Sequence, residues 1–291
     1  MIDIIIPTYR RTALLKRVLP YYLAQRDVSS ILIVEDGPLS LEVAALAQEQ
    51  AKPAIVTIAT GRQSGAPAAK RLGLERATAE FVAFGEDDAF PGQNYYAQLA
   101  AHVQEGRADV AAGAVHYLGA IDENWSTGAI ARMEDRPSFG NVHEENGLVY
   151  GAATQALYLG PRALLLRQLP DLGYGGNGWR EETDPLIALW GEGRRIALDP
   201  TAVFYHLPRG YQQGGGQHAR SRLAYEYWCL HNDFRFFCKH KESLEKLGFH
   251  GPAFLFALTQ SAIRWQSKIA ARLKPVAPST PVALPPVEAS V

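Results

Sequence analysis

Three consecutive carboxylates, Glu86, Asp87 and Asp88, stand just after a short apolar run at 81–84. Acidic residues are common in solvated turns, and that is the simplest interpretation of such a triplet. Hard divalent cations such as Mg²⁺ and Mn²⁺, however, bind carboxylate oxygens together with the phosphates of a substrate. The triplet is therefore a candidate cation site, if the fold places it where a phosphorylated ligand binds.

Two other polar segments follow apolar runs in the same way. The run at 2–6 leads into a loop that consists of Pro7, Thr8, Tyr9 and Arg10. Glu35 ends the run at 31–35, and Asp36 comes next. Polar side chains at such positions can hydrogen-bond a nucleotide base or ribose, although an ordinary polar turn has the same composition. We predict nucleotide contacts for both segments.

A later acidic cluster offers a general base. Glu181 and Glu182 follow a glycine-rich segment, and a carboxylate in such a loop is well placed to take a proton. Proline suits the first helical turn and disfavours helical geometry in the residue before it, so Pro185 predicts that Asp184 is a helix N-cap. His206 ends another apolar run and is either structural or a metal ligand.

The first part of the chain alternates apolar runs with helix-like segments. The predicted strands are 2–6, 31–35, 54–59, 81–84 and 108–115, and the predicted helices are 12–25, 41–50, 66–78 and 92–106. Short apolar strands that alternate with helices are typical of a parallel sheet covered on both faces, where ligands bind beyond the carboxyl ends of the strands. The acids at 35–36 and 86–88 should therefore share one edge.

The second half of the chain has a different pattern. We expect an irregular segment at 116–148, strands at 148–160, 194–198 and 202–206, helices at 161–169, 185–193, 217–247 and 252–273, and a disordered proline-rich tail at 274–291. The predicted organisation is a nucleotide-sugar-binding half at 1–115, an acceptor-binding and catalytic half at 116–210, a helical extension at 211–273 and the tail.

Composition narrows the function classes. The chain has 291 residues, 47% of them hydrophobic, and its net charge of −1 argues against a nucleic-acid-binding protein. Two cysteines form no disulfide framework, so a reducing cytoplasm is expected. The start MIDIIIPTYRR does not resemble a signal peptide, and no run reaches the length of about 20 apolar residues that a membrane span needs.

The order of these motifs resembles that of family 2 glycosyltransferases, inverting enzymes with the GT-A fold, over about residues 2–240. IIIPTYRR is similar to the family's opening strand and loop, and IVEDGP to its V-D-D-G-S block. SGAPAAKRLGLERATAEFVAFGEDD is similar to the G-x-x-x-A-R-N-x-G-L block and the D-x-D signature. WREETDPLIALWGEGRRIALDPTAVFYH is similar to the E-D-x-D-L block with its strand and histidine.

The resemblance implies roles for single residues. Asp88, with Glu86 and His206, falls on the metal-binding positions, and Glu35 falls on the acid that contacts the base. The catalytic block aligns with Glu181, Glu182 and Asp184, of which Glu182 takes the position of the base. Lys70 and Arg71, which we also expect to contact the donor, stand where Ala-Arg-Asn is usual. Glu86 and Glu182 replace aspartates, and Pro38 replaces a serine. These departures leave the choice of base open among the three acids.

The resemblance also implies the reaction. An acceptor hydroxyl would attack the anomeric carbon of a UDP-, dTDP- or GDP-linked sugar while Mn²⁺ or Mg²⁺ stabilises the diphosphate. Acceptors would be a saccharide, a lipid-linked glycan or a small-molecule aglycone, contacted by Trp125, Tyr174 and Trp179. The alternatives are a nucleotide-sugar-binding protein without catalysis and a sugar-phosphate nucleotidyltransferase, although PTYRRTALL lacks the glycines of the latter.

The last helical segment leaves three interpretations open. It mixes apolar residues with four basic ones: Arg264, Lys268, Arg272 and Lys274. A segment of this kind can rest on the inner face of an anionic membrane, pack on the core, or contact a second subunit in a homodimer.

Overall fold

The computed structural model describes residues 1–48, 52–139, 142–211, 221–273 and 280–286. The strands are β1 (Ile2–Thr8), β2 (Val28–Glu35), β3 (Ala54–Ala59), β4 (Phe81–Phe84), β5 (Ala89–Pro91), β6 (Val110–Ile121), β7 (Thr127–Glu134), β8 (His143–Glu145), β9 (Leu148–Gly151), β10 (Tyr158–Pro161), β11 (Ile196–His206) and β12 (Thr280–Ala283). The helices are α1 (Thr12–Leu23), α2 (Leu41–Leu46), α3 (Ala66–Arg76), α4 (Tyr95–Gln104), α5 (Arg162–Leu165), α6 (Thr183–Gly191), α7 (Arg222–Lys239), α8 (Lys241–Lys246) and α9 (Ala253–Leu273), with a 3₁₀ turn at Arg209–Tyr211.

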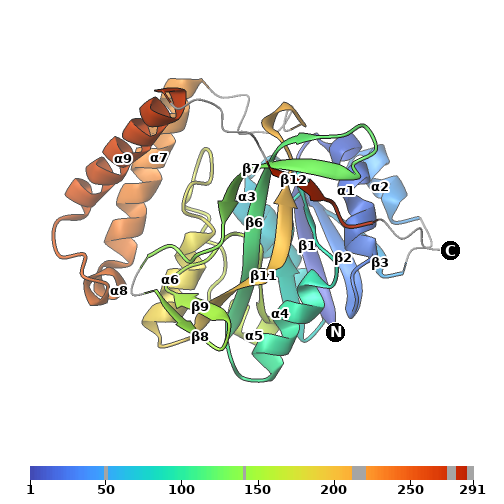
Figure 1. The fold of residues 1–291 in the computed structure, drawn as a ribbon, viewed down its shortest axis with the longest axis horizontal. Coiled ribbons are helices and arrows are strands. Elements are labelled where there is room, and N and C mark those ends of the chain that lie inside the picture. Colours follow the sequence, from blue (N-terminus) through green and yellow to red (C-terminus); the bar gives the residue numbers. More distant parts are fainter. Residues whose placement is uncertain (49–51, 140–141, 212–220, 274–279, 287–291) are drawn as a thin grey trace.

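The described strands form one sheet with helices on both faces, and α7 and α9 lie to one side of it (Figure 1). Its main path runs β3–β2–β1–β4–β10–β6–β11–β9–β8. The first four strands of this path are parallel, and β10 is antiparallel to both of its neighbours. The predicted mostly parallel α/β sheet is therefore confirmed.

The parallel register brings the strand ends together. Thr8 lies opposite Glu35 across β1 and β2, and the N–H of Gly85 donates to the carbonyl of Ile5. Parallel strands all point their carboxyl ends to one edge, so the loops after β1, β2 and β4 meet there. The two acidic clusters share this edge, as the sequence predicted.

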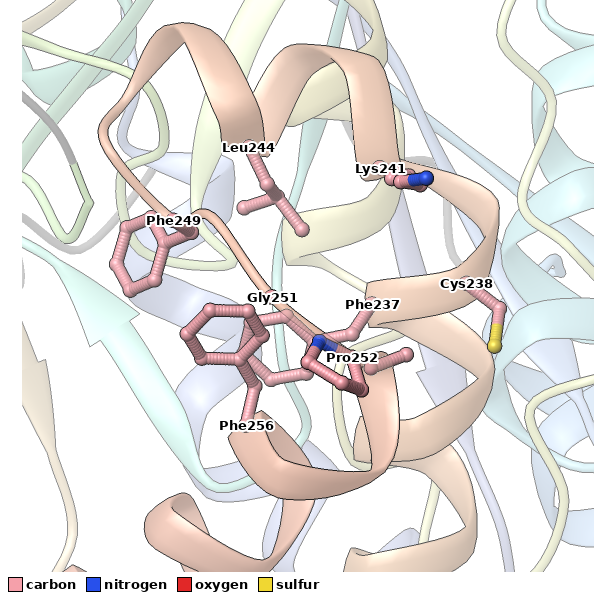
Figure 2. Close-up of a pocket in the computed structure, with 9 residues that line it drawn as sticks. Phe237, Cys238, Lys241, Leu244, Phe249, Gly251, Pro252 and Phe256 are labelled. Atoms are coloured by element: carbon pink, nitrogen blue, oxygen red, sulfur yellow. The ribbon is translucent and has the colours of Figure 1, made fainter.

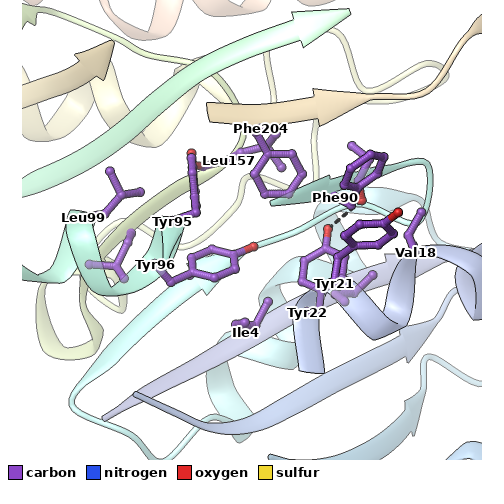
Figure 3. Close-up of a cluster of buried hydrophobic side chains, with 14 of the residues drawn as sticks. Ile4, Val18, Tyr21, Tyr22, Phe90, Tyr95, Tyr96, Leu99, Leu157 and Phe204 are labelled. Carbon is purple, nitrogen blue, oxygen red and sulfur yellow. Dashed lines mark hydrogen bonds between the residues drawn. The ribbon is translucent and has the colours of Figure 1, made fainter. Parts of the chain in front are cut away.

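A cluster of buried aromatic side chains (Figure 3) packs next to the acidic loop at 86–88. Tyr22, Tyr95, Tyr96 and Phe204 are fully buried, and each such side chain stabilises the fold by about 1.5–3 kcal/mol. The Tyr22 hydroxyl accepts a hydrogen bond from the N–H of Glu86 at 2.9 Å and lies 3.0 Å from the carbonyl of Ala89. A Cβ at Gly85 would lie 2.7 Å from the Tyr22 ring, so the loop needs glycine there.

Most of the described residues at 116–148 belong to strands β6, β7 and β8, whereas the prediction was an irregular segment. β6 continues to Ile121 and pairs with β7 through a turn in which Asp122 accepts hydrogen bonds from the N–H and hydroxyl of Ser126. Several exposed positions of these strands hold small or apolar residues, namely Gly119, Ala120, Ala131 and Met133, so residue type does not alternate with burial as expected of a half-exposed strand. Trp125 in this turn is buried against Tyr21 and Phe90, so it belongs to the core and not to an acceptor site.

Other element bounds also depart from the prediction. β11 is one strand with an irregularity between Asp199 and Val203, where two strands were expected. β6 crosses residue 115, so the two predicted halves share a strand. Pro20 lies inside α1 without dividing it.

Part of the proline-rich tail is ordered, which corrects the prediction of disorder. β12 pairs with β7, whose edge offers backbone N–H and C=O groups for hydrogen bonding. Leu284, which follows β12, is buried. Residues 274–279 and 287–291 lie outside the described part of the chain. Over the described ranges, none of the helices has both the length and the hydropathy to cross a bilayer.

Candidate active site

A cleft of about 850 Å³ opens at the carboxyl ends of the parallel strands. Its lining includes Pro7, Thr8, Tyr9, Arg11, Asp36, Lys70, Glu86, Asp87, Asp88, Glu181, Glu182 and His206. A hollow of about 250 Å³ lies elsewhere, among α7, α8 and α9, and is lined mainly by apolar side chains with Lys241 at its rim (Figure 2). Only the larger cleft brings several titratable groups together among the residues described, so it is the candidate active site.

Two carboxylates and an imidazole form a candidate cation site in this cleft. Ligand atoms of Glu86, Asp88 and His206 all lie within 4.8 Å of one another. The pairing of β11 with β5 places His206 opposite Ala89, and its Nε2 lies 3.5 Å from Glu86 and 3.8 Å from Asp88. Burial, followed by the Asp88 carboxylate, raises the pKa of Glu86 well above its usual value. These oxygen and nitrogen donors fit Mn²⁺ or Mg²⁺.

Arg11 compensates for the repulsion within the acidic triplet. Its guanidinium lies 2.9 Å from both Asp87 and Asp88, and the Thr8 hydroxyl donates to Asp87 at 2.7 Å. Burial, followed by the charge of Asp88, nevertheless raises the pKa of Asp87 to about 6. Asp87 is thus held by protein groups, and Asp88 has one oxygen beside His206.

The neighbouring Arg10, which the sequence favoured for ligand contact, is exposed. It has a φ of 53°, its guanidinium stacks over the ring of Tyr9 at 5.1 Å, and it is not among the described lining residues. The sequence does not indicate which of the two adjacent arginines points into the cleft, because this depends on the left-handed backbone conformation of Arg10.

The two acids after β2 point to different places. Asp36 lines the cleft and accepts hydrogen bonds from the N–H groups of Ser64 at 2.6 Å and Gly65 at 2.9 Å. Glu35 instead accepts from the N–H of Ser40 at 2.7 Å, at the start of α2, and is not among the cleft's described lining residues. The geometry therefore favours Asp36 over Glu35 for ligand contact.

A buried lysine connects α3 to the catalytic block. Lys70 donates from Nζ to Glu181 and to Glu182, both at 2.8 Å. Burial disfavours its charge, but the two carboxylates raise its pKa above the usual value. The Glu181 side chain is 5% exposed, whereas that of Glu182 is 38% exposed and can meet an acceptor. Arg71 points elsewhere and pairs with Glu75 on the surface of α3.

Asp184 is not the predicted N-cap, because α6 begins at Thr183, two residues earlier than predicted, and its N-cap residue, Glu182, makes no side-chain cap. Its carboxylate accepts hydrogen bonds from the Tyr174 hydroxyl at 2.7 Å, Lys239 at 2.7 Å and His240 at 2.5 Å. It is not among the described residues that line the cleft. The last turn of α7 is fixed to α6 by this carboxylate, which the sequence could not indicate because the partners are distant in the chain.

Replacing Asp184 with asparagine should therefore reduce stability. We expect a loss of about 1–3 kcal/mol, because buried His240 loses a charged acceptor, whereas Lys239 is partly exposed and keeps Asp171 as a partner. Urea unfolding measures this loss, and Glu192→Gln, which loses only an exposed ion pair with Arg167 at the end of α6, is the control with a change below about 1 kcal/mol. Unchanged stability in Asp184→Asn would contradict a structural role.

The glycine-rich loop is held by α7. A Cβ at Gly176 would lie 2.0 Å from the Trp228 ring, and Asn232 donates to the carbonyl of Gly175 at 3.0 Å. Trp179 donates from its indole nitrogen to Asp233 at 2.9 Å and is not among the described lining residues, whereas Tyr174 does line the cleft. The C-terminal helices thus position the loop that carries Glu181 and Glu182.

The pKa of Glu181 predicts a pH-dependent stability. Burial raises it from 4.5 to about 7, although Lys70 opposes the shift and Glu182 adds to it. Between these values the folded chain binds more protons than the unfolded chain, so the free energy of unfolding falls as pH rises. Glu181→Gln removes this fall, and its stability relative to wild type should increase by up to roughly 3 kcal/mol from pH 4.5 to pH 8. Urea unfolding at both pH values checks this, and a constant difference would contradict it.

The family of the chain and its fold follow from comparisons with known proteins. Residues 3–158 match the family model described as Glycosyl transferase family 2. A 1–349 structure of S. aureus TarS has a TM-score of 0.58 at 14% identity, covering 88% of this chain and 71% of that one. The same fragment with UDP-GlcNAc has a TM-score of 0.57 at 14% identity, covering 86% and 68%. GalNAc-T7 with UDP, GalNAc and Mn²⁺ has a TM-score of 0.57 at 14% identity, covering 94% and 57%.

Such identities demonstrate the fold alone, and they confirm the predicted GT-A architecture. The chain spans only 42% of the longer TarS structure. No curated protein sequence is significantly similar to it. The family model matches more than half of the 291 residues, and the chain therefore belongs to glycosyl transferase family 2.

Proposed function

We propose that the chain transfers a sugar from a UDP-sugar to an acceptor hydroxyl with inversion at the anomeric carbon. The observation that carries this proposal is that one cleft contains two groups of residues. The candidate cation ligands Glu86, Asp88 and His206 form one, and the carboxylates of Glu181 and Glu182, both bound to Lys70, form the other. The TarS fragment with UDP-GlcNAc and the GalNAc-T7 structure with UDP support a UDP-linked donor over a dTDP- or GDP-linked one.

The donor would lie along the carboxyl ends of β1, β2 and β4. Asp36 and the loop at 7–9 contact the base and ribose, since their polar atoms line that end of the cleft. Glu86, Asp88 and His206 would hold Mn²⁺ or Mg²⁺, which supplies positive charge to the leaving diphosphate. Arg11 keeps Asp87 and Asp88 in place and lowers the net negative charge that the phosphates meet.

Glu182 would act as the general base. It is the more exposed of the two carboxylates on Lys70, so an acceptor hydroxyl can reach it. As the acceptor oxygen bonds to the anomeric carbon, its proton passes to Glu182 and the bond from that carbon to the diphosphate breaks. Glu181 and Lys70 act as positioning residues, because they fix Glu182 without facing the acceptor.

Two other functions fit the residues less well. A nucleotide-sugar-binding protein without catalysis would not need a base beside the cation cluster. A sugar-phosphate nucleotidyltransferase would show glycines after β1, where this chain has Pro7–Arg10. Family membership also favours the transferase.

The anomeric configuration of the product tests the proposal. We expect an α-linked UDP-sugar to give a β-linked product, as read from proton NMR coupling constants with a panel of simple saccharide acceptors. An α-linked product would rule out single attack with Glu182 as base. UDP release without transfer to any saccharide would show that water is the acceptor under these conditions. The natural acceptor would then be a lipid-linked or small-molecule hydroxyl.

A further inference from the structure

The two long C-terminal helices, α7 and α9, lie to one side of the sheet (Figure 1), and they expose large apolar side chains. Eight side chains on them are 41–81% exposed: Leu223, Tyr227, Phe234, Phe254, Leu255, Leu258, Trp265 and Ile269. We call this set the α7–α9 face. Exposed apolar residues are normal when scattered, but a contiguous set on two packed helices indicates a binding surface.

The spacing of these residues matches that of helix-packing seams. On α7 the positions 223, 227 and 234 are separated by 4 and 7 residues, and on α9 the positions 258, 265 and 269 by 7 and 4. Such intervals place side chains in one stripe along a helix, as at the a and d positions of a coiled coil. The opposite side of α7 is already buried in the protein. The stripes are therefore free to pack against further helices.

The two helices run antiparallel, which makes the face self-complementary. Contacts between them join Glu226 to Lys268, Asp233 to Arg264, and Phe237 to Phe256, so one residue number rises as the other falls. A two-fold axis across such a pair places α7 and α9 of two copies in a four-helix arrangement.

The exposed area fits a dimer. An aromatic side chain offers roughly 150–250 Å² and an aliphatic one somewhat less, so the eight together expose roughly 700–900 Å². A stable interface covers about 800 Å² on each partner. The face therefore has the size that a specific protein contact needs.

The charges around the face favour a protein over a membrane. Helices that lie on anionic lipid present lysines and arginines that are free to meet the headgroups. Among the basic side chains of α7 and α9 that the structure describes, Arg264 pairs with Asp233, Lys268 with Glu226, and both Arg235 and Lys239 with Asp171. The guanidinium of Arg222 stacks on Trp265. The face itself carries no charge, so two copies of it meet without repulsion.

From this area, spacing and charge we infer that the α7–α9 face binds the same face of a second copy of the chain. The cleft opens at the strand ends and its lining contains none of the eight side chains, so each copy keeps its own active site. The inference is independent of the transferase reaction.

Sedimentation velocity of the whole chain, from about 1 to about 100 µM, tests this inference. We expect a dimer for wild type, and at least about 100-fold weaker association for the double variant Leu223→Glu with Leu258→Glu. Ile263→Glu is the matched control: it is 48% exposed on α9 but lies about 200° around the helix from Trp265, so it should remain dimeric. Circular dichroism confirms that each variant is folded.

Three outcomes would overturn the inference. Wild type that stays monomeric over this range excludes the dimer. A double variant that dimerises like wild type places the interface elsewhere. Monomeric wild type that sediments with phosphatidylserine vesicles, in a way that the double variant does not, assigns the face to a membrane.

Discussion

Replacing Glu182 with glutamine is expected to lower kcat by about 10²–10⁴-fold while donor affinity changes no more than a few-fold. Glutamine has the shape of glutamate, and its amide oxygen can still accept the 2.8 Å hydrogen bond from Lys70. It has no basicity with which to take the acceptor proton. Steady-state UDP release gives kcat, and calorimetry with UDP gives the donor affinity.

Two further variants help to interpret this result. Glu192→Gln changes an exposed carboxylate at the end of α6 and should leave kcat unchanged. Glu181→Gln alters the partner of Lys70 without removing the base, so its kcat should lie between that of wild type and that of Glu182→Gln. Full activity in Glu182→Gln would show that another group is the base. Lost UDP binding in this variant would place Glu182 in the donor site.

Replacing Asp88 with alanine is expected to weaken Mn²⁺-dependent UDP binding by at least about 100-fold. Removal of groups that merely support metal ligands already costs about 10–100-fold, and Asp88 supplies an oxygen to the cluster itself. The substitution also removes one of the two carboxylates that the described residues place beside Arg11, so more positive charge faces an incoming cation. Calorimetry of UDP in the presence and absence of Mn²⁺ measures the effect.

Asp27→Asn is the matched control for Asp88→Ala. Asp27 is exposed and has a φ of 62°, a conformation that asparagine adopts readily. Its replacement removes one negative charge far from the cleft and should leave UDP binding unchanged. Equal Mn²⁺-dependent UDP binding in Asp88→Ala and Asp27→Asn would contradict the cation site.

The sequence predicted those parts of the site that depend on strand ends. Asp36, Glu86 and Asp88 follow apolar runs, and a parallel sheet gathers such positions at one edge whatever the details of the loops. Long-range partners were out of reach, because no local pattern shows which basic group meets which acid. The bonds of Lys70 to Glu181 and Glu182 are examples, since more than 100 residues separate them.

Local backbone geometry explains the remaining differences. Arg11, not Arg10, turns toward the acids because Arg10 has a positive φ. The early start of α6 turns Asp184 toward α7 and away from the cleft. The β6–β7 hairpin was missed because several of its exposed positions hold small or apolar residues, so the sequence shows no regular alternation. In each case the local sequence is compatible with several backbone conformations, and tertiary packing determines which one forms.

The melting temperature of the chain with UDP, dTDP and GDP, each with and without Mn²⁺, tests the central claim most directly. A ligand that binds only the folded state raises this temperature, and the increase grows with the logarithm of the ligand concentration relative to its Kd. We expect UDP with Mn²⁺ to raise it by several degrees, and UDP alone, Mn²⁺ alone and the other nucleotides to raise it far less. An unchanged melting temperature with every nucleotide, at concentrations well above those of ordinary donor binding, would contradict a donor site in this cleft.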